Sequence, residues 1–397
     1  MTFKAPLAYL SVNRDVWTID AEGKHRSHTE IDVDALMLGS WQTGPKRTGT
    51  FSWPTWSPNG DQVACFKLAD AHHDTSRVFV CDVDGVNQTE LMDLGKRLPI
   101  YLFWSPNSKH IAMLSQGDDK LMLSTGRPDR AGTEITLAEG SPLFFTWAGS
   151  GQVAAFIGGT NDARTSRLVL MDPKGTGNTT LLPGNPGSFC APVCIDGNLF
   201  YVSHERGNTS FVTARSGAAE STWIDDVDGL VAMVASPDGK TLARAVASSG
   251  DGTPYHSLSL VDIETLQTRP LWEQSCLAFA WTPNGKAIVA AQVDTTRNLL
   301  QWYRIDLDGR HELLVSMYPT RDLGFYLRFF EQYTQSHSLM NPDGTHIVLP
   351  GGIHGHTEAQ GASRLWAIPL DGSDRPRELG QGLFAVFGPK SKPADPS

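Results

Sequence analysis

The segment Trp56-Ser57-Pro58-Asn59-Gly60, followed by the apolar run Gln62-Val63-Ala64-Cys65-Phe66, decides the fold of this 397-residue chain. Pro fixes φ at the first central position of a tight turn, Asn tolerates turn geometry, and Gly accepts a positive φ. A short apolar run directly after such a turn is typical of a β-strand. The segment therefore predicts the end of one strand, a tight turn and the start of the next strand.

Similar turns, each followed by a short apolar strand, recur along the chain. The other clear copies begin at Trp104, Trp147, Ala235, Trp281 and Met340, and a degenerate copy anchored at Cys194 lies between Trp147 and Ala235. Successive copies are 41 to 59 residues apart. A repeat of about 45 residues that holds several strands is typical of a β-propeller, in which each blade has four strands.

A second turn, Asp-x-Asp-Gly or a related sequence, ends a strand further along each repeat and occurs eight times. Its first copy, at residues 19–23, has no Trp-Ser-Pro turn before it, and the unmatched apolar segment is 382–390. The sequence therefore predicts an all-β chain that forms a single closed β-propeller domain of eight four-stranded blades. Residues 382–390 would supply the inner strand of a shared blade whose other strands come from 6–30. Seven blades are the alternative, and 391–397 are predicted to be a disordered tail.

The combination of Trp-Ser-Pro-Asn-Gly, an apolar strand and an Asp-x-Asp-Gly turn resembles the TolB-type propeller repeat. The resemblance covers essentially the whole chain. The same repeat occurs in the propeller domains of prolyl oligopeptidases and tricorn-like proteases. The resemblance implies the architecture but says little about activity, because the family includes translocation accessories, protease gates and lyases.

The composition limits the classes of partner. The formal net charge is −10, which argues against nucleic acid or an anionic membrane, because both attract Lys and Arg. No stretch approaches 18 apolar residues, so no membrane span is predicted. The N-terminal residues lack a signal-peptide pattern, which predicts a cytoplasmic protein, or a periplasmic one if a leader has been removed.

Several catalytic motifs are missing from the sequence, and the cysteines follow no metal-binding pattern. There is no Gly-x-Ser-x-Gly elbow, no phosphate-binding Gly-rich loop and no His-Glu-x-x-His helix. The five cysteines are scattered and are predicted to be buried free thiols. Pairing of Cys65 with Cys81 in an oxidising compartment is the alternative.

Three loops are unusually long for this fold: residues 31–51, 316–336 and 351–364. All three adjoin the last blade or the shared blade, on the face that carries the connections between blades. Loops held by a rigid scaffold commonly carry binding or catalytic residues. We therefore expect the functional site at this mouth of the central channel.

A divalent metal site is one candidate there. Two imidazoles in His354-Gly355-His356 can converge on a metal, with His337 as a third ligand and Glu331, Tyr333 or His337 in the acid–base chemistry. The His-x-His pattern is similar to that of oligogalacturonate lyases, propellers that hold a metal with histidines and a glutamine at the channel. The wider lyase pattern is not matched, and solvated loop histidines are the alternative interpretation.

Other polar and aromatic residues of these loops, and of equivalent loops in other blades, are candidates for ligand contacts. The predicted ligand-binding residues are Trp41, His72, His73, His204, Arg206, Tyr326, Arg328 and Gln335. Arg and aromatic side chains are frequent anchors of binding surfaces.

Two functions are compatible with these features. The favoured one is a non-catalytic scaffold that binds a protein, a peptide or a small polar ligand at the channel mouth. The alternative is a metal-assisted lyase or hydrolase that acts on a carbohydrate or small metabolite at the same face. No cofactor other than a divalent metal is predicted.

Overall fold

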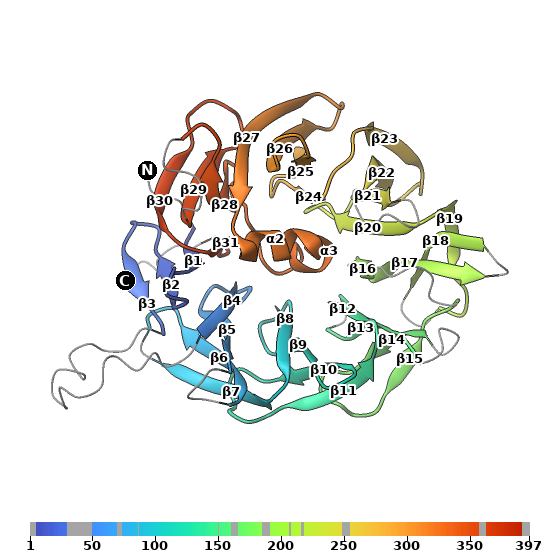
Figure 1. The fold of residues 1–397 in the computed structure, drawn as a ribbon. Coiled ribbons are helices and arrows are strands. Elements are labelled where there is room, and N and C mark those ends of the chain that lie inside the picture. The colour runs from blue at the N-terminus through green and yellow to red at the C-terminus, as the bar shows by residue number, and fades with distance from the viewer. Residues whose placement is uncertain are drawn as a thin grey trace, which may run out of the picture.

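The structure is a computed structural model that describes residues 5–29, 50–69, 74–85, 87–149, 151–159, 166–184, 191–205, 208–215, 218–247, 255–356 and 363–390. These residues form antiparallel sheets arranged in a ring, with two short helices near its centre (Figure 1). Neither described helix has the length and apolar character needed to cross a membrane.

Five sheets are meanders of four consecutive strands, each starting near the centre of the ring and running outward (Figure 1). The first two sheets contain β4 (Thr50–Trp56), β5 (Gln62–Leu68), β6 (Ser76–Asp82), β7 (Gln88–Gly95), β8 (Leu98–Trp104), β9 (Ile111–Gln116), β10 (Leu121–Gly126) and β11 (Ile135–Gly140). The other three contain β12 (Leu143–Trp147), β13 (Val153–Ile157), β14 (Arg167–Met171), β15 (Thr179–Leu181), β16 (Val193–Ile195), β17 (Asn198–Glu205), β18 (Asn208–Arg215), β19 (Thr222–Asp226), β20 (Leu230–Ala235), β21 (Thr241–Ala247), β22 (His256–Asp262) and β23 (Thr268–Trp272).

A sixth sheet has seven strands, because β27 continues into pairing with β28 through Met317↔Ile353, Tyr318↔Gly352 and Pro319↔Gly351. An isolated bridge between Met340 and Ile347 adds the Met340 segment to β28. The strands of this sheet are β24 (Ala278–Trp281), β25 (Ala287–Asp294), β26 (Leu299–Asp306), β27 (His311–Pro319), β28 (His346–Ile353), β29 (Arg364–Pro369) and β30 (Arg377–Gln381).

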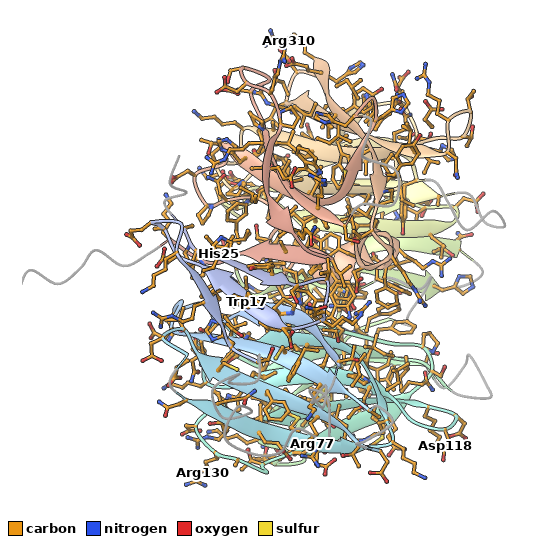
Figure 2. The ribbon with its side chains drawn as sticks, turned by 60° about the vertical axis from the view of Figure 1, so that its left-hand side comes forward. Trp17, His25, Arg77, Asp118, Arg130 and Arg310 are labelled. Atoms are coloured by element: carbon orange, nitrogen blue, oxygen red, sulfur yellow. The ribbon has the colours of Figure 1, made fainter. Side chains whose placement is uncertain are left out.

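The remaining sheet combines the two ends of the chain. Its order is β3 (His25–Ser27), β2 (Val16–Ile19), β1 (Leu7–Leu10) and β31 (Phe384–Phe387), with Leu7 opposite Phe387 and Leu10 opposite Phe384. Trp17 and His25 both pack against the Tyr9 ring on this sheet, whereas charged side chains such as Arg130 and Arg310 lie at the outer rim (Figure 2).

The Trp-Ser-Pro turns have one repeated hydrogen-bond pattern. The Ser57 hydroxyl donates to the Gln62 carbonyl and accepts from the Gln62 N–H, and the Gly60 N–H donates to the Ser57 carbonyl. The Thr282 hydroxyl bonds to Ala287 in the same way. A hydroxyl residue is therefore placed after the motif tryptophan because it satisfies the backbone of the turn that follows.

The motif tryptophans connect neighbouring sheets. Each indole N–H donates to a carbonyl of the innermost strand of the preceding sheet, over 3.0 to 3.3 Å. The pairs are Trp56–Val386, Trp104–Thr55, Trp147–Phe103 and Trp281–Val234. Four smaller apolar clusters likewise each span two adjacent sheets. The repeat is therefore a structural device that joins one sheet to the next.

The described cysteines are free thiols, and Cys65, Cys81 and Cys276 are buried, as the sequence predicted. Cys65 and Cys81 lie on the paired strands β5 and β6. The hydrogen bond that the Cys65 thiol donates to Cys81, together with burial, raises the pKa of Cys65.

Gly351 marks the closest backbone approach between β27 and β28. A Cβ at this position would lie 2.1 Å from the Tyr318 carbonyl oxygen, and its φ of +151° is rare for other residues. We expect Gly351→Ala to lower the free energy of unfolding by about 2–3 kcal/mol, through overpacking and backbone strain. Gly324→Ala is the matched control: nothing lies within 4 Å of its Cβ, and alanine favours the helix. Equal denaturation midpoints for Gly351→Ala and the parent chain would contradict this account.

Candidate functional site

The second long loop of the sequence prediction, residues 316–336, begins inside β27 and then forms two helices instead of an open loop. They are α2 (Arg321–Arg328) and α3 (Phe330–Tyr333), and they lie at the centre of the ring (Figure 1). Thr320 caps α2, because its hydroxyl accepts from the Leu323 N–H at 3.2 Å and donates to the Leu383 carbonyl at 2.7 Å.

Charged side chains also stabilise helix α2. Asp322 in its first turn and Arg328 in its last turn both have the sign that the helix dipole favours. Asp322 forms an ion pair at 3.3 Å with Arg14 of the N-terminal sheet. Tyr326 and Leu327 are buried on the inner side of this helix. We refer to residues 321–338, which contain both helices and the turn after them, as the central plug.

Aromatic rings surround the central plug. The Tyr333 ring centroid lies 4.7 Å from that of Trp53 and 4.9 Å from that of Tyr101, and Phe330 lies 4.9 Å from Phe279. Trp53 has a φ of +54°, an unusual conformation for a bulky residue, at a bulge of β4. This bulge places the Trp53 indole against the plug. The centre of the circle of sheets is therefore a packed aromatic core.

Polar groups of the plug satisfy the channel-facing edges of the inner strands. The Gln332 side chain accepts from the Phe145 N–H at 3.2 Å and donates to the Phe145 carbonyl at 2.6 Å. The Tyr101 hydroxyl donates to the Gln332 carbonyl at 2.7 Å. Gln335, predicted to contact ligand, accepts from the Thr146 hydroxyl. The plug is therefore hydrogen-bonded to β8 and β12.

The three predicted acid–base residues all lie in the plug and are all buried: Glu331, Tyr333 and His337. The Tyr333 hydroxyl donates to the Ile100 carbonyl at 2.6 Å, and His337 Nδ1 lies 2.7 Å from the Ser336 hydroxyl. Burial raises the pKa of Tyr333 well above its usual value and lowers the pKa of His337 to about 3. At neutral pH both side chains are therefore uncharged.

Glu331 is incompletely paired: one of its carboxylate oxygens has no hydrogen-bond partner among the described residues, which is also true of His337 Nε2. Burial raises the pKa of this carboxyl to about 8, against a weaker opposing effect of the Ala191 N–H. At neutral pH the protonated form is therefore favoured, which is unusual for glutamate.

We expect Tyr333→Phe to lower the free energy of unfolding by about 1 kcal/mol, because it removes the hydrogen bond to Ile100 and leaves the ring in place. Equilibrium denaturation measures this change. Tyr318→Phe, at a half-buried tyrosine of β27, is the control, with an expected change below about 0.5 kcal/mol. No loss of stability in Tyr333→Phe would show that the hydroxyl has no structural role.

The structure does not bring the three predicted metal ligands into one group. His354 and His356 are exposed; His354 lies beside Tyr318 and His356 packs on the Trp366 ring at 5.5 Å, whereas His337 is inside the plug. In the described part of the chain, no three His, Cys, Asp or Glu side chains are placed to hold a metal ion. Metal binding therefore stays a prediction without a ligand set.

The predicted ligand-binding residues are scattered. His204 is exposed on β17 and pairs with the Thr209 hydroxyl, Arg328 is exposed on α2, and Tyr326 is buried with its hydroxyl donating to the His337 carbonyl at 3.1 Å. Four others lie outside the described residues: Trp41, His72, His73 and Arg206.

Two adjoining cavities lie against the plug. The deep cavity, of about 270 Å³, has mainly apolar walls that include Phe279, Trp281 and Trp302. The turn cavity, of about 320 Å³, is lined by the Trp-Ser-Pro turns and by the hydroxyl and amide residues of the plug. Pro283, Thr334, Ser338 and Met340 line both. Neither cavity is lined by a charged side chain from the described residues.

The position of these cavities differs from the predicted one. Pro58, Pro283 and Pro342 belong to the turns after the innermost strands, whereas the sequence predicted the site at the end of the channel that carries the connections between blades. Two predicted ligand-binding residues of the 316–336 segment nevertheless line the cavities: Tyr326 the deep cavity and Gln335 the turn cavity. Sequence reasoning used the Trp-Ser-Pro turns only as evidence for architecture and so missed them as a site. The repeat itself could have indicated this site, because the seven turns are expected to lie together at one end of the channel.

Comparison with known proteins places this arrangement among solved folds. No family model and no curated protein sequence matches the chain. An oligogalacturonate lyase in complex with manganese superposes with a TM-score of 0.51 at 12% identity, over 89% of this chain and 82% of that one. A structure from a study of two prolyl endopeptidases gives 0.51 at 11%, over 92% of this chain and 54% of that one.

The chain is a β-propeller. TolB from Acinetobacter baumannii is also similar, with a TM-score of 0.44 at 13% identity, and the chain covers 64% of its length. At these identities the likeness concerns the fold alone, so the lyase and peptidase activities belong to those proteins. In this propeller, the observations that bear on function are the central plug and the two cavities beside it.

Proposed function

We propose that this propeller is a non-catalytic binding scaffold and that an uncharged peptide segment enters the channel at the end formed by the Trp-Ser-Pro turns. The observation that carries the proposal is the pair of uncharged cavities beside the plug. Ligand sites are typically concave, mostly apolar and equipped with a few polar groups, and these cavities have that character.

The chemistry of the walls favours a neutral ligand. The hydroxyl groups of Ser336 and Ser338 lie beside aromatic surfaces, which suits peptide groups flanked by apolar side chains. The Gln335 amide is already bonded to Thr146 and Glu331. A charged ligand would lose its hydration there without an ion-pair partner among the described lining residues. The proposal therefore moves the predicted site to the other end of the channel and keeps the predicted scaffold role.

We also propose that the ring has eight blades. The seven-stranded sheet would count as two of them, β24–β27 and β28–β30, with the Met340 segment as the innermost strand of the second. The other six sheets of four strands, including the one shared by the chain ends, would supply the rest. The plug then lies on the connection between the seventh and eighth blades.

The test is a binding screen with N-acetylated, C-amidated neutral hexapeptides against the purified chain, followed by titration of the best binders. Ala280→Phe adds a ring to the deep cavity from β24 and should weaken binding at least tenfold. Trp223→Ala removes an aromatic side chain that is 60% exposed on the outer strand β19 and should leave binding unchanged.

Thermal denaturation of both variants establishes that they are folded. The proposal is wrong if hexapeptides bind the folded Ala280→Phe variant as tightly as the parent chain, or if binding is lost only in Trp223→Ala. It is equally wrong if no neutral hexapeptide binds the parent chain.

A further inference from the structure

Helix α2 has an uncovered face toward the end of the channel that lies opposite the turn cavity. Its cap residue Thr320 donates to the carbonyl of Leu383, which directly precedes the innermost strand β31. The turn cavity, by contrast, is lined by Trp56 and Phe387, the last residues of β4 and β31. Helix α2 therefore lies toward the end of the channel where the innermost strands begin.

The uncovered face consists of four exposed residues, Arg321, Gly324, Phe325 and Arg328. Their spacing of i, i+3, i+4 and i+7 places them in one stripe along the helix. A Cβ at Gly324 would have nothing within 4 Å, so no described residue packs directly on the middle of this stripe. We refer to these four residues as the outer face of α2.

The two arginines of the outer face have no acidic partner among the described residues. Asp322, the acidic residue of α2, is bound to Arg14 at 3.3 Å, and no ion pair joins a described carboxylate to Arg321 or Arg328. The chain as a whole has a formal net charge of −10. The outer face of α2 is therefore a local positive site on an acidic protein.

An exposed aromatic ring lies between the two arginines and is held in place by its neighbours. Phe325 is 39% exposed, and its ring centroid lies 5.4 Å from that of Trp53 and 5.2 Å from that of Phe329. A ring that is already ordered loses little conformational entropy when a ligand packs on it. Arginine and aromatic residues are also the types that dominate the binding energy of interfaces.

We propose that the outer face of α2 binds an acidic peptide segment of a partner protein, through ion pairs to Arg321 and Arg328 and an apolar side chain on Phe325. Arginine pairs well with carboxylates, because its planar guanidinium can donate two parallel hydrogen bonds. The net charge of −10 argues against nucleic acid or an anionic membrane, because such a large polyanion would also meet the acidic remainder of the surface. A short segment meets only the outer face.

The inference is independent of the proposed function. That function concerns the cavities, and the deep cavity is lined by Tyr326 and Leu327 on the buried side of α2. The outer face lies on the other side of the same helix and is lined by different residues.

The spacing of the outer face predicts the spacing of charges in the ligand. Arg321 and Arg328 are seven positions apart, which is about 10 Å along a helix. In an extended peptide, residues i, i+2 and i+4 point to the same side and span about 13 Å. The long arginine side chains bridge the difference, so we expect the pattern Glu-x-Leu-x-Glu, with the leucine on Phe325.

The test uses the heptapeptide Ac-Gly-Glu-Thr-Leu-Thr-Glu-Gly-NH2, titrated into the full chain by isothermal titration calorimetry at low salt. A control peptide with glutamine in place of both glutamates should bind about fivefold to tenfold more weakly, as expected for the loss of two exposed ion pairs. A peptide with threonine in place of the leucine should also bind more weakly, because it loses the contact with Phe325.

Variants of the chain identify the contacts. Arg321→Gln and Arg328→Gln should each weaken binding of the heptapeptide about twofold to fivefold, and the double variant should bind the glutamate and glutamine peptides equally. Phe325→Ala should weaken the binding of both peptides to the same extent. Arg310→Gln, at an arginine whose side chain is 80% exposed on the outer rim, is the matched control and should leave binding unchanged (Figure 2). Thermal denaturation establishes that each variant is folded.

Equal affinity of the parent chain for the glutamate and glutamine peptides would overturn the proposal, as would a preference that survives in the folded double variant. If a heparin fragment or phosphatidylserine vesicles bind through Arg321 and Arg328 while the heptapeptide does not, the outer face binds a polyanion and the proposal is wrong. Ala280→Phe separates the two proposals, because it should weaken the binding of neutral hexapeptides and leave the binding of the acidic heptapeptide unchanged.

Discussion

Removal of residues 383–397 is expected to leave the chain unable to fold stably at 25 °C. The truncation deletes β31, whose Phe384, Val386 and Phe387 are buried, and each such side chain contributes about 1.5–3 kcal/mol. The total of about 5–9 kcal/mol is comparable with the whole stability of a typical domain. The truncation also exposes the edge of β1, and an exposed strand edge can pair with another chain and cause aggregation.

Several other contacts are lost with this strand. Trp56 loses the Val386 carbonyl, Thr320 loses the Leu383 carbonyl that helps to cap α2, and Trp53 loses the Phe384 ring at 4.9 Å. The deletion therefore affects the neighbouring sheet and the central plug together. Soluble yield and a thermal unfolding curve followed by circular dichroism measure the effect.

The matched control ends the chain after Lys390 and removes only residues 391–397. We expect its melting temperature to lie within about 2 °C of that of the full chain, because no described contact is lost. A chain lacking 383–397 that melts cooperatively at the temperature of the full chain would show that the ring does not depend on the pairing of β1 with β31.

Glu331→Gln is expected to stabilise the protein at alkaline pH and to have little effect at pH 4.5. The folded-state pKa of about 8 lies above the ordinary value of 4.5. Between these values the unfolded chain loses the proton and the folded chain keeps it, so stability is highest below about pH 4.5 and falls as the pH rises to about 8. Glutamine stays neutral throughout and avoids this loss, which is about 3–5 kcal/mol.

Urea denaturation of both proteins at several pH values from 4.5 to 9 measures the difference. The buried His337 is present in both chains, so its own pH dependence cancels in the comparison. Glu220→Gln, at an exposed position, is the control and should show no pH-dependent difference. A constant difference between Glu331→Gln and the parent chain across this range would contradict the account of a buried, protonated carboxyl.

The candidate site could be predicted from the sequence only in part. The stretch around Glu331, Tyr333 and His337 stood out because it interrupted the repeat, and these residues do lie at the centre of the ring. Their roles were harder to predict, because a tyrosine in an open loop and a tyrosine that donates to Ile100 in a packed core have the same local sequence. The helical folding of 321–333 depends on contacts with strands far away in the chain.

Trp302 shows the same limit more sharply. In the sequence it is one of the eleven tryptophans, on a strand with ordinary alternation. Only the tertiary structure shows that the buried Trp302 indole has no partner among the described residues, whereas the Trp281 indole donates to the Val234 carbonyl. An unpaired buried donor cannot be recognised from the sequence, because its possible partners lie on other strands and not among its neighbours in the chain.

The sequence by itself determined the all-β propeller class, because the Trp-Ser-Pro turns are local devices: Pro, Gly and the hydroxyl of Ser57 act within five residues. Only the tertiary structure decided that residues 321–338 fill the centre of the ring and that the cavities lie at the Trp-Ser-Pro end. Turn geometry depends on neighbours in the chain, whereas the plug and the cavities depend on side chains from distant sheets, and those contacts exist only once the ring has formed.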